Sequence, residues 1–258
     1  MHKLTESILK GIQKIAPQDY FSLGDFCTSI ANSIQKVFDI EQDGIHNTDM
    51  LELDFFHLMI LEHLKKNQNI EWIGTGTFSS VFSIKNTDKA FKINIASCDS
   101  HYDSWLSYAK KIMNSEFDNP WLPKIHFLIE KENIYAAIVD KLSPVSINGK
   151  HFQKNIIGCI RNIIEAVEKA DFKKFKSEEN TISAILEQYE NSHVSSKILK
   201  AIELILSVQR STKSIFDIYP QNIMIDCNLN IIINDPLSYN NSLIEIKKNS
   251  PERLLCVK

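Results

Sequence analysis

A glycine-rich turn occupies Ile73-Gly74-Thr75-Gly76-Thr77-Phe78-Ser79-Ser80-Val81, between two segments with the composition of β-strands. The chain has only 7 glycines, and two of them stand two positions apart here. Glycines let backbone N–H groups approach phosphate oxygens closely, and Phe78 can fold over such a ligand as a lid. An ordinary hairpin turn is the competing interpretation. A dinucleotide site of the βαβ type is excluded, because the turn leads into a strand and offers a pyrophosphate no helix N-terminus.

Short strands are expected on both sides of this turn and for some distance after it. The pattern predicts a helix over Asp103–Met113, after the third strand. The expected strands are Glu71–Ile73, Ser80–Ile84, Ala90–Ile95, Lys124–Glu130 and Tyr135–Asp140.

Helical segments flank the strands. Apolar residues recur every three or four positions up to about Lys66, which predicts three or more amphipathic helices. Beyond Pro144 we expect helices and then two short strands, at Asn155–Ala170, Thr181–Tyr189, Ser195–Val208, Ile223–Ile225 and Ile231–Ile233. The sequence thus predicts an α+β protein in three parts: a helical extension (1–69), a sheet with one helix (70–142) and a mainly helical segment (143–258).

The composition excludes several classes of function. Lys and Arg number 29 against 32 Asp and Glu, so the net charge of −3 provides no positive field for nucleic acid or an anionic membrane. The 5 cysteines form no C-x-x-C pair, which argues against a disulfide framework or a zinc knuckle. No signal-peptide core and no apolar stretch of about 18 residues are present. We therefore expect a cytoplasmic protein without nucleic-acid or membrane partners.

The strand after the turn carries a lysine. Ala90 and Lys92 alternate with the apolar Phe91 and Ile93, so Lys92 points to the face where phosphates bound by the turn would lie. A solvated lysine on an edge strand is the competing interpretation.

A third group of polar residues lies far downstream. Asp217 precedes Asn222 by five positions, and Asp235 closes the hairpin predicted from the two isoleucine runs. A carboxylate, an amide and a second carboxylate in this order are the components of a magnesium-dependent phosphoryl-transfer site. Asp217 would accept a proton from the attacking hydroxyl, while Asn222 and Asp235 would ligate metal. Singly, the two aspartates are also typical of turns before proline.

These motifs resemble the protein-kinase superfamily from about Glu71 to Ser238. The similarity is closest to the small early serine/threonine protein kinases of short-tailed phages, whose metal-binding aspartate also precedes a proline. Bacterial effector kinases and toxin kinases of the HipA type are more loosely similar. The resemblance implies a two-lobed kinase-like fold that uses ATP with Mg²⁺ or Mn²⁺ and phosphorylates proteins of a host cell.

The resemblance also implies residue roles. Lys92 would hold the α- and β-phosphates, Asp140 to Leu142 would form the hinge that binds adenine, and Asp217, Asn222 and Asp235 would carry out catalysis. The other nucleotide-binding residues implied are Gly74, Thr75, Gly76, Thr77, Phe78, Ser79, Val81 and Ala90.

Four departures from the family pattern are visible. Ser79 replaces the third loop glycine, and Ile215 and Phe216 replace the histidine and arginine before the catalytic aspartate. Tyr219 replaces a lysine that would neutralise the transferring group. Only 23 residues follow Asp235 (258 − 235), so we expect a reduced large lobe. No carboxylate stands at an obvious position to pair with Lys92, and Asp103 is the residue that we select.

The sequence therefore predicts an ATP- and magnesium-dependent serine/threonine protein kinase. A small-molecule phosphotransferase and a nucleotide-binding pseudokinase that acts as an interaction module are the alternatives. Hydroxyls in the glycine-rich turn predict autophosphorylation at Ser79 and Ser80, which would repel the ATP phosphates. Alternatively, these hydroxyls satisfy the backbone of the turn. The apolar stripes of the N-terminal helices are expected to pack on the kinase lobes.

Overall fold

The computed structural model describes most of the chain, and the described residues form two compact units. The first unit takes in those of Met1–Tyr102 and Lys124–Lys141, and the second those of Asp103–Pro123 and Leu142–Leu255. None of the described helices is both long enough and apolar enough to cross a membrane. The described residues are 3–42, 50–75, 79–95, 100–115, 118–132, 134–145, 149–169, 183–188 and 195–238.

An antiparallel sheet of five strands forms the centre of the first unit, with the strand order β1-β2-β3-β5-β4. Each strand begins and ends within two residues of its predicted range, so these predictions are confirmed. Strand β3 is central, because it pairs with β2 on one side and with β5 on the other. The strands are β1 (Ile70–Thr75), β2 (Ser79–Ile84), β3 (Lys89–Ile95), β4 (Ile125–Glu130) and β5 (Ile134–Asp140).

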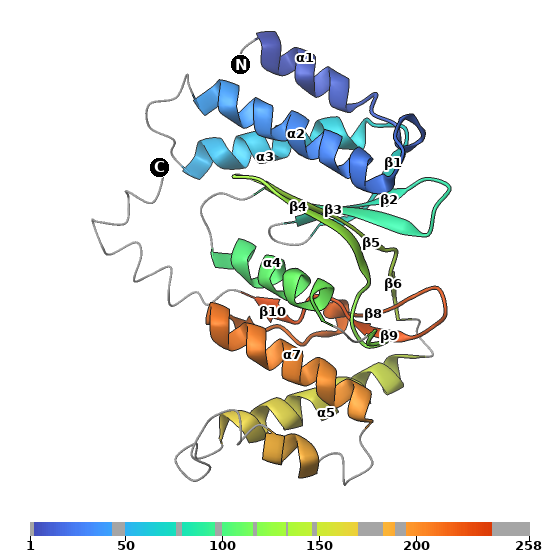
Figure 1. The fold of residues 1–258 in the computed structure, drawn as a ribbon, viewed down its shortest axis with the longest axis vertical. Coiled ribbons are helices and arrows are strands. Elements are labelled where there is room, and N and C mark those ends of the chain that lie inside the picture. The colour runs from blue at the N-terminus through green and yellow to red at the C-terminus, as the bar shows by residue number, and fades with distance from the viewer. Residues whose placement is uncertain are drawn as a thin grey trace, which may run out of the picture. The chain divides into compact units, whose positions relative to one another are not determined.

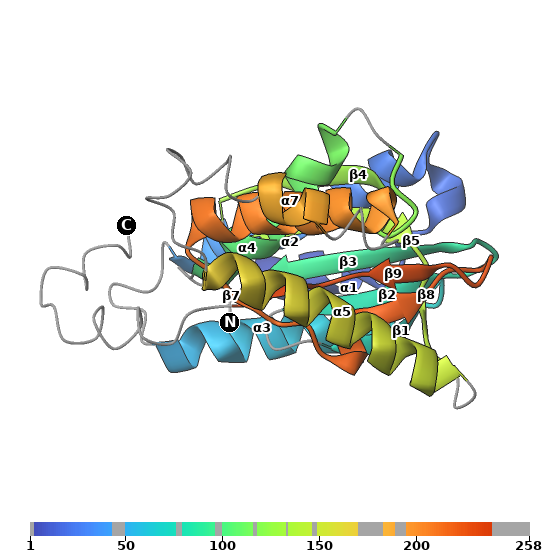
Figure 2. The same ribbon diagram turned by 90° about the horizontal axis from the view of Figure 1, so that it is seen from below.

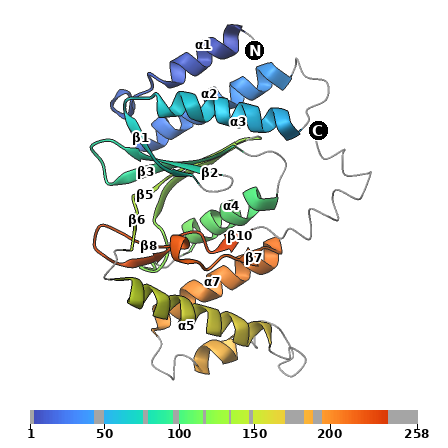
Figure 3. The same cartoon turned by 180° about the vertical axis from the view of Figure 1, so that it is seen from behind.

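Three helices, α1 (Lys3–Ile12), α2 (Leu23–Gln42) and α3 (Met50–Lys65), cover one face of this sheet, as Figures 1 and 3 show. Their apolar residues share one core with the strands, as the buried contact between the rings of Phe26 and Phe91 illustrates. The helices were expected to pack on kinase lobes, and the structure shows them packed on this sheet. Because the core is shared, the helices belong to the same unit as the sheet.

Close approaches fix these helices in place. A Cβ atom at Gly24 of α2 would lie 2.8 Å from the ring of Phe127 on β4, so only glycine fits without a shift. The buried side chain of Asn67, which follows α3, donates hydrogen bonds of 2.8 Å to the carbonyls of both Ile12 and Ile15. The end of α1 and the start of β1 are thus joined by buried polar contacts.

The second unit is built around α5 (Lys150–Glu168) and α7 (Ser196–Thr212), seen in Figure 2. Residues 183–188 form a further short helix. Strands β8 (Ile223–Ile225) and β9 (Ile231–Ile233) form a hairpin with the predicted bounds. Three strands have only two residues each: β6 (Ser143–Pro144), β7 (Ile215–Phe216) and β10 (Leu237–Ser238). Strand β6 pairs with β8, and β7 pairs with β10.

Helix α4 (Ser100–Met113) departs from the predicted division of the chain, because residues 103–123 cluster with the second unit. The reason is its packing. The buried hydroxyl of Tyr108 donates to the carbonyl of Ile233 at 2.8 Å, and the amide of Ile233 donates to Trp121 at 2.8 Å. The expected mixture of helices with an antiparallel sheet is confirmed.

Candidate active site

The loop after β7 brings Asp217 and Asn222 into direct contact. Asn222 lies in a single 3₁₀ turn (Pro220–Asn222), which returns the chain toward Asp217. Its Nδ2 donates to the Asp217 carbonyl at 2.9 Å and to Asp217 Oδ2 at 2.8 Å. The amide of Tyr219 also donates to the Asp217 carbonyl, at 3.0 Å. We call residues 217–223 the catalytic loop, after the role that the sequence predicts for Asp217.

The segment that carries Asp235 is attached to this loop through the main chain. The amide of Asp217 donates to the carbonyl of Pro236 at 2.7 Å, and the amide of Asn234 donates to the carbonyl of Asn222 at 2.8 Å. Pairing of β7 with β10 continues the contact. The structure therefore brings together three of the predicted catalytic residues, Asp217, Asn222 and Asp235, within the second unit.

The environment of Asp217 favours its protonated form. Burial raises the pKa of this half-buried carboxyl, and the charge of Asp235 raises it further, while the hydrogen bond from Asn222 opposes the rise. A raised pKa brings a carboxylate closer to the value at which a general base accepts a proton efficiently near neutral pH. The predicted base thus has a physical cause for increased basicity.

The donor set of the loop suits a hard cation. Both hydrogen atoms of the Asn222 amide serve Asp217, which leaves Oδ1 without a hydrogen bond among the described residues. This oxygen and the Asp235 carboxylate are oxygen ligands, and Mg²⁺ is commonly bound by one or two such groups together with phosphates and water. The described residues contain no group of three or more His, Cys, Asp or Glu that could hold a metal by themselves. The residues present therefore fit a magnesium ion whose remaining ligands would be phosphate oxygens and water.

Lys92 lies in the first unit, on the central strand β3, opposite Val81 and Ala137. It is only 6% exposed and has an interaction partner. Buried lysines are rare unless they are paired. The interpretation of Lys92 as a solvated lysine on an edge strand is therefore wrong. Phe91 and Ile93 belong to the core shared with the helices, so Lys92 stands on the opposite face of the sheet, as predicted.

The two ends of the glycine-rich turn lie among the described residues. Gly74 lies in β1, and a Cβ there would meet no described atom within 4 Å. Thr75 ends β1, and Val81 and Ala90 lie in paired strands. The residues predicted for the tip, Gly76, Thr77 and Phe78, lie outside the described residues.

The two predicted autophosphorylation residues differ in accessibility. Ser79 begins β2 and is half-buried. Ser80 is fully buried and has an interaction partner, so its hydroxyl is not accessible to an incoming phosphoryl group in this conformation. Burial therefore argues against Ser80 and leaves Ser79 as the candidate.

Asp140 ends β5 at the start of the predicted hinge. Its Oδ1 accepts from Lys89 Nζ and from His126 Nε2, both at 2.7 Å. Burial would raise the pKa of Asp140, but these hydrogen bonds and charges outweigh it and lower the pKa below its ordinary value. The carboxylate of Asp140 is therefore engaged within the sheet, and Leu142, two residues later, is half-buried.

Two further predicted residues are Lys92 and Asp103. Lys92 belongs to the first unit, whereas Asp217, Asn222 and Asp235 belong to the second. Asp103, selected as the partner of Lys92, lies in the first turn of α4, but its side chain is outside the described residues.

Two residues that the sequence did not suggest contact the catalytic loop from α5. Gln153 Nε2 donates to the carbonyls of Pro220 at 2.8 Å and Ile223 at 2.7 Å. Arg161 Nη2 donates to the carbonyl of Ile218 at 2.7 Å. Neither stands in a motif. Their sequence signal is slight: Gln153 interrupts the apolar stripe of the amphipathic α5, and Arg161 stands on the exposed part of the helix.

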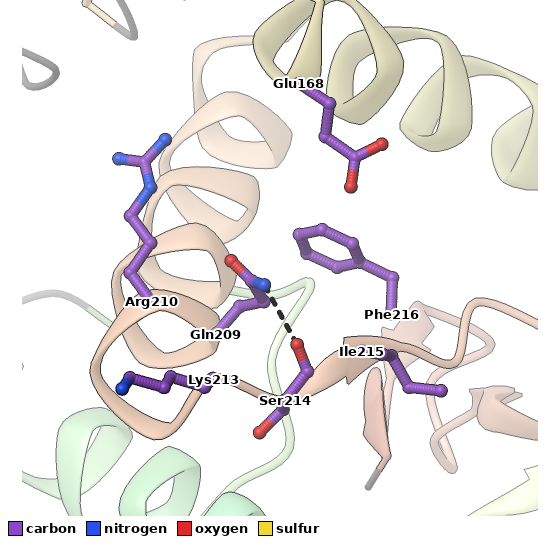
Figure 4. A pocket seen from close by; sticks show the side chains of 7 residues that line it. All are labelled: Glu168, Gln209, Arg210, Lys213, Ser214, Ile215 and Phe216. Atoms are coloured by element: carbon purple, nitrogen blue, oxygen red, sulfur yellow. Dashed lines mark hydrogen bonds between the residues drawn. The ribbon is translucent and has the colours of Figure 1, made fainter. Parts of the chain in front are cut away.

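Two hollows lie beside the loop in the second unit, with volumes of about 500 and 610 Å³. Phe216 and Glu168 line both. Figure 4 shows these two side chains directed toward each other in the first hollow, where Gln209 donates to the carbonyl of Ser214 at 2.9 Å. The second hollow extends to Tyr219. Phe216, which stands where the kinase pattern has an arginine, is partly buried against the apolar core of the second unit.

No model of a known protein family matches the chain, and no curated protein sequence matches it.

Proposed function

We propose that the protein is an ATP- and magnesium-dependent kinase that transfers the γ-phosphoryl group of ATP to serine or threonine hydroxyls of proteins, including its own. The observation that carries the proposal is the loop geometry. Asn222 binds both the carbonyl and the carboxylate of Asp217, while the segment with Asp235 is bonded to the same loop. A base and two oxygen ligands in adjoining segments are what phosphoryl transfer requires.

Each residue has a distinct task in this proposal. Asp217 accepts the proton of the acceptor hydroxyl as that oxygen attacks the γ-phosphorus, and the bond to the β-phosphate oxygen breaks. Asn222 and Asp235 hold magnesium, which when bound neutralises charge on the phosphates. Lys92 contacts the α- and β-phosphates, and its burial on a central strand supports a fixed position for its ammonium group. The glycine-rich turn covers the nucleotide.

The acceptor class is the less constrained part of the proposal. Tyr219 stands where a kinase lysine would contact the transferred group. Tyr219 is 49% exposed, and the guanidinium carbon of Arg161 lies 5.1 Å from the centroid of its ring. An exposed ring at this position suits an apolar or aromatic neighbour of the acceptor hydroxyl. A peptide or a small molecule can supply such a neighbour, and because Tyr219 brings no charge to the transferred group, its presence favours the small-molecule alternative.

Radiolabelled ATP tests the proposal. The purified protein is incubated with labelled ATP and Mg²⁺, alone and with a bacterial lysate, in parallel with Asp217→Asn and with Asp39→Asn, an exposed aspartate on α2. We expect label on proteins with the wild type and with Asp39→Asn, and none with Asp217→Asn. Label confined to small molecules would replace the protein acceptor by a small-molecule one. A wild type that binds ATP but transfers no label would instead indicate an interaction module.

A further inference from the structure

One side of the catalytic loop is held by side chains of a single helix. Gln153, which is only 6% exposed, donates both hydrogens of its amide to the loop, to the carbonyls of Pro220 and Ile223. Arg161 donates to the Ile218 carbonyl and covers the ring of Tyr219. All four partners lie within the loop, and both donors come from α5.

The spacing of the two donors matches the loop. Gln153 and Arg161 stand eight residues apart, which is about 12 Å along a helix. The five steps from Ile218 to Ile223 span at most about 17 Å when extended, and the 3₁₀ turn shortens this distance. Two side chains of one rigid helix can therefore contact the loop at both Ile218 and Ile223.

Two main-chain amides of the loop are bonded within it. The amides of Tyr219 and Asn222 donate to the carbonyls of Asp217 and Tyr219 at 3.0 and 2.9 Å. These two bonds join residues within the loop, so they do not fix its position relative to the rest of the second unit. Main-chain bonds to Asn234 and Pro236 attach the loop to the segment that carries Asp235, and the side-chain contacts from α5 hold it as well. A displacement of about 1 Å at a catalytic group can lower a rate about 100-fold.

We infer that Gln153 and Arg161 are positioning residues, which hold the catalytic loop from α5 so that Asp217 and Asn222 stand at the correct distance from the reacting groups. This inference rests on the proposed kinase function. Neither residue belongs to the kinase-like motifs. The histidine and arginine that precede the catalytic aspartate in those motifs are replaced here by Ile215 and Phe216.

Three variants and one control test the inference. Arg161→Met removes the donor and the cation, and Arg161→Lys keeps a cationic donor. Gln153→Glu keeps the shape but turns a carboxylate toward two carbonyl oxygens. Lys154→Met removes an exposed charge from the same helix and serves as the control. Because Arg161 is exposed, its variants are expected to fold even if Gln153→Glu does not.

Two readouts are measured on the full chain: kcat and KM for ATP with casein as acceptor, and amide hydrogen exchange at Tyr219 and Asn222. We expect Arg161→Met to lower kcat about 10- to 100-fold with little change in KM for ATP. Exchange at the two amides should become faster, Arg161→Lys should recover most of the activity, and Lys154→Met should behave as wild type. Wild-type kcat and exchange in Arg161→Met and Gln153→Glu would overturn the inference. A parallel loss of kcat, ATP affinity and thermal stability would overturn it also, since that pattern indicates general destabilisation.

The exchange readout separates this inference from the proposed function. If the wild type transfers no phosphoryl group to any acceptor, the proposed function fails, and with it the catalytic part of the inference. Faster exchange at Tyr219 and Asn222 in Arg161→Met would still support the positioning of the loop by α5, and unchanged exchange would refute it.

Discussion

Replacing Asp217 with asparagine is expected to abolish activity and, at the same time, to stabilise the protein at neutral pH. Burial and the charge of Asp235 raise the pKa of Asp217 despite the hydrogen bond from Asn222. A carboxyl whose pKa is higher in the folded state than in the unfolded state favours folding only while it is protonated. Its contribution is fully present below about pH 4 and is lost as the pH rises through the raised pKa.

The size of the effect follows from the exposure of the group. One pKa unit corresponds to about 1.4 kcal/mol, but solvent screens a half-exposed carboxylate, so we expect a gain of at most about 1 kcal/mol for Asp217→Asn at pH 7. Asparagine retains an oxygen that accepts from Asn222 Nδ2, and it removes the repulsion from Asp235. For a chain of this size, this gain raises Tm by about 2–4 °C at most.

Differential scanning calorimetry between pH 3.5 and pH 8 measures the effect. The Tm difference between Asp217→Asn and wild type should be close to zero at the acid end and should grow toward neutrality. Asp39→Asn, which replaces an exposed carboxylate, should show no such growth. A variant that is less stable than wild type at pH 7, or equally displaced at every pH, would show that Asp217 does not destabilise the fold when ionised.

Three further predictions concern the nucleotide and the core. The thermal shift produced by ATP should require Mg²⁺ or Mn²⁺, because Asn222 and Asp235 offer only oxygen ligands, and an equal shift in EDTA would contradict this site. Lys92→Met should lose the ATP-induced shift without losing Tm, because methionine fills the buried volume, whereas Lys85→Met in the exposed turn should retain it. Gly24→Ala should lower stability by about 1–3 kcal/mol in denaturant unfolding through its clash with the Phe127 ring, and an unchanged midpoint would show that α2 can shift away from β4.

Much of the fold could be predicted from the sequence, because its signals are local. The isoleucine runs at 223–225 and 231–233 are too short for helices and lie on either side of a polar turn, so both strands were predicted with the observed bounds. The strands β6, β7 and β10 could not be foreseen, since each has two residues and exists only because of a distant partner, as in the pairing of Phe216 with Leu237.

The candidate site also contains residues that could be predicted from the sequence and residues that could not. Asp217, Asn222 and Asp235 stand in a recognisable order, and the contact between the first two supports the spacing from which they were selected. Gln153 and Arg161 act through bonds to backbone carbonyls, which every residue possesses, so no pattern around Pro220 or Ile218 points to them. The packing of residues 103–123 with the second unit likewise depends on Tyr108, whose tertiary contact is not encoded in its neighbours.

The core shared by the N-terminal helices and the sheet has a consequence for synthesis of the protein on the ribosome. The helices end at Lys65, but the last strand of the sheet, β5, is complete only at Asp140, 75 residues later (140 − 65). At about 5–20 residues per second, roughly 4–15 s pass between these two points. During that interval side chains such as Phe26 and Ile30, which end fully buried, have no finished sheet to cover them. We therefore expect the nascent chain to expose an apolar helical surface for seconds before the sheet that covers it is complete.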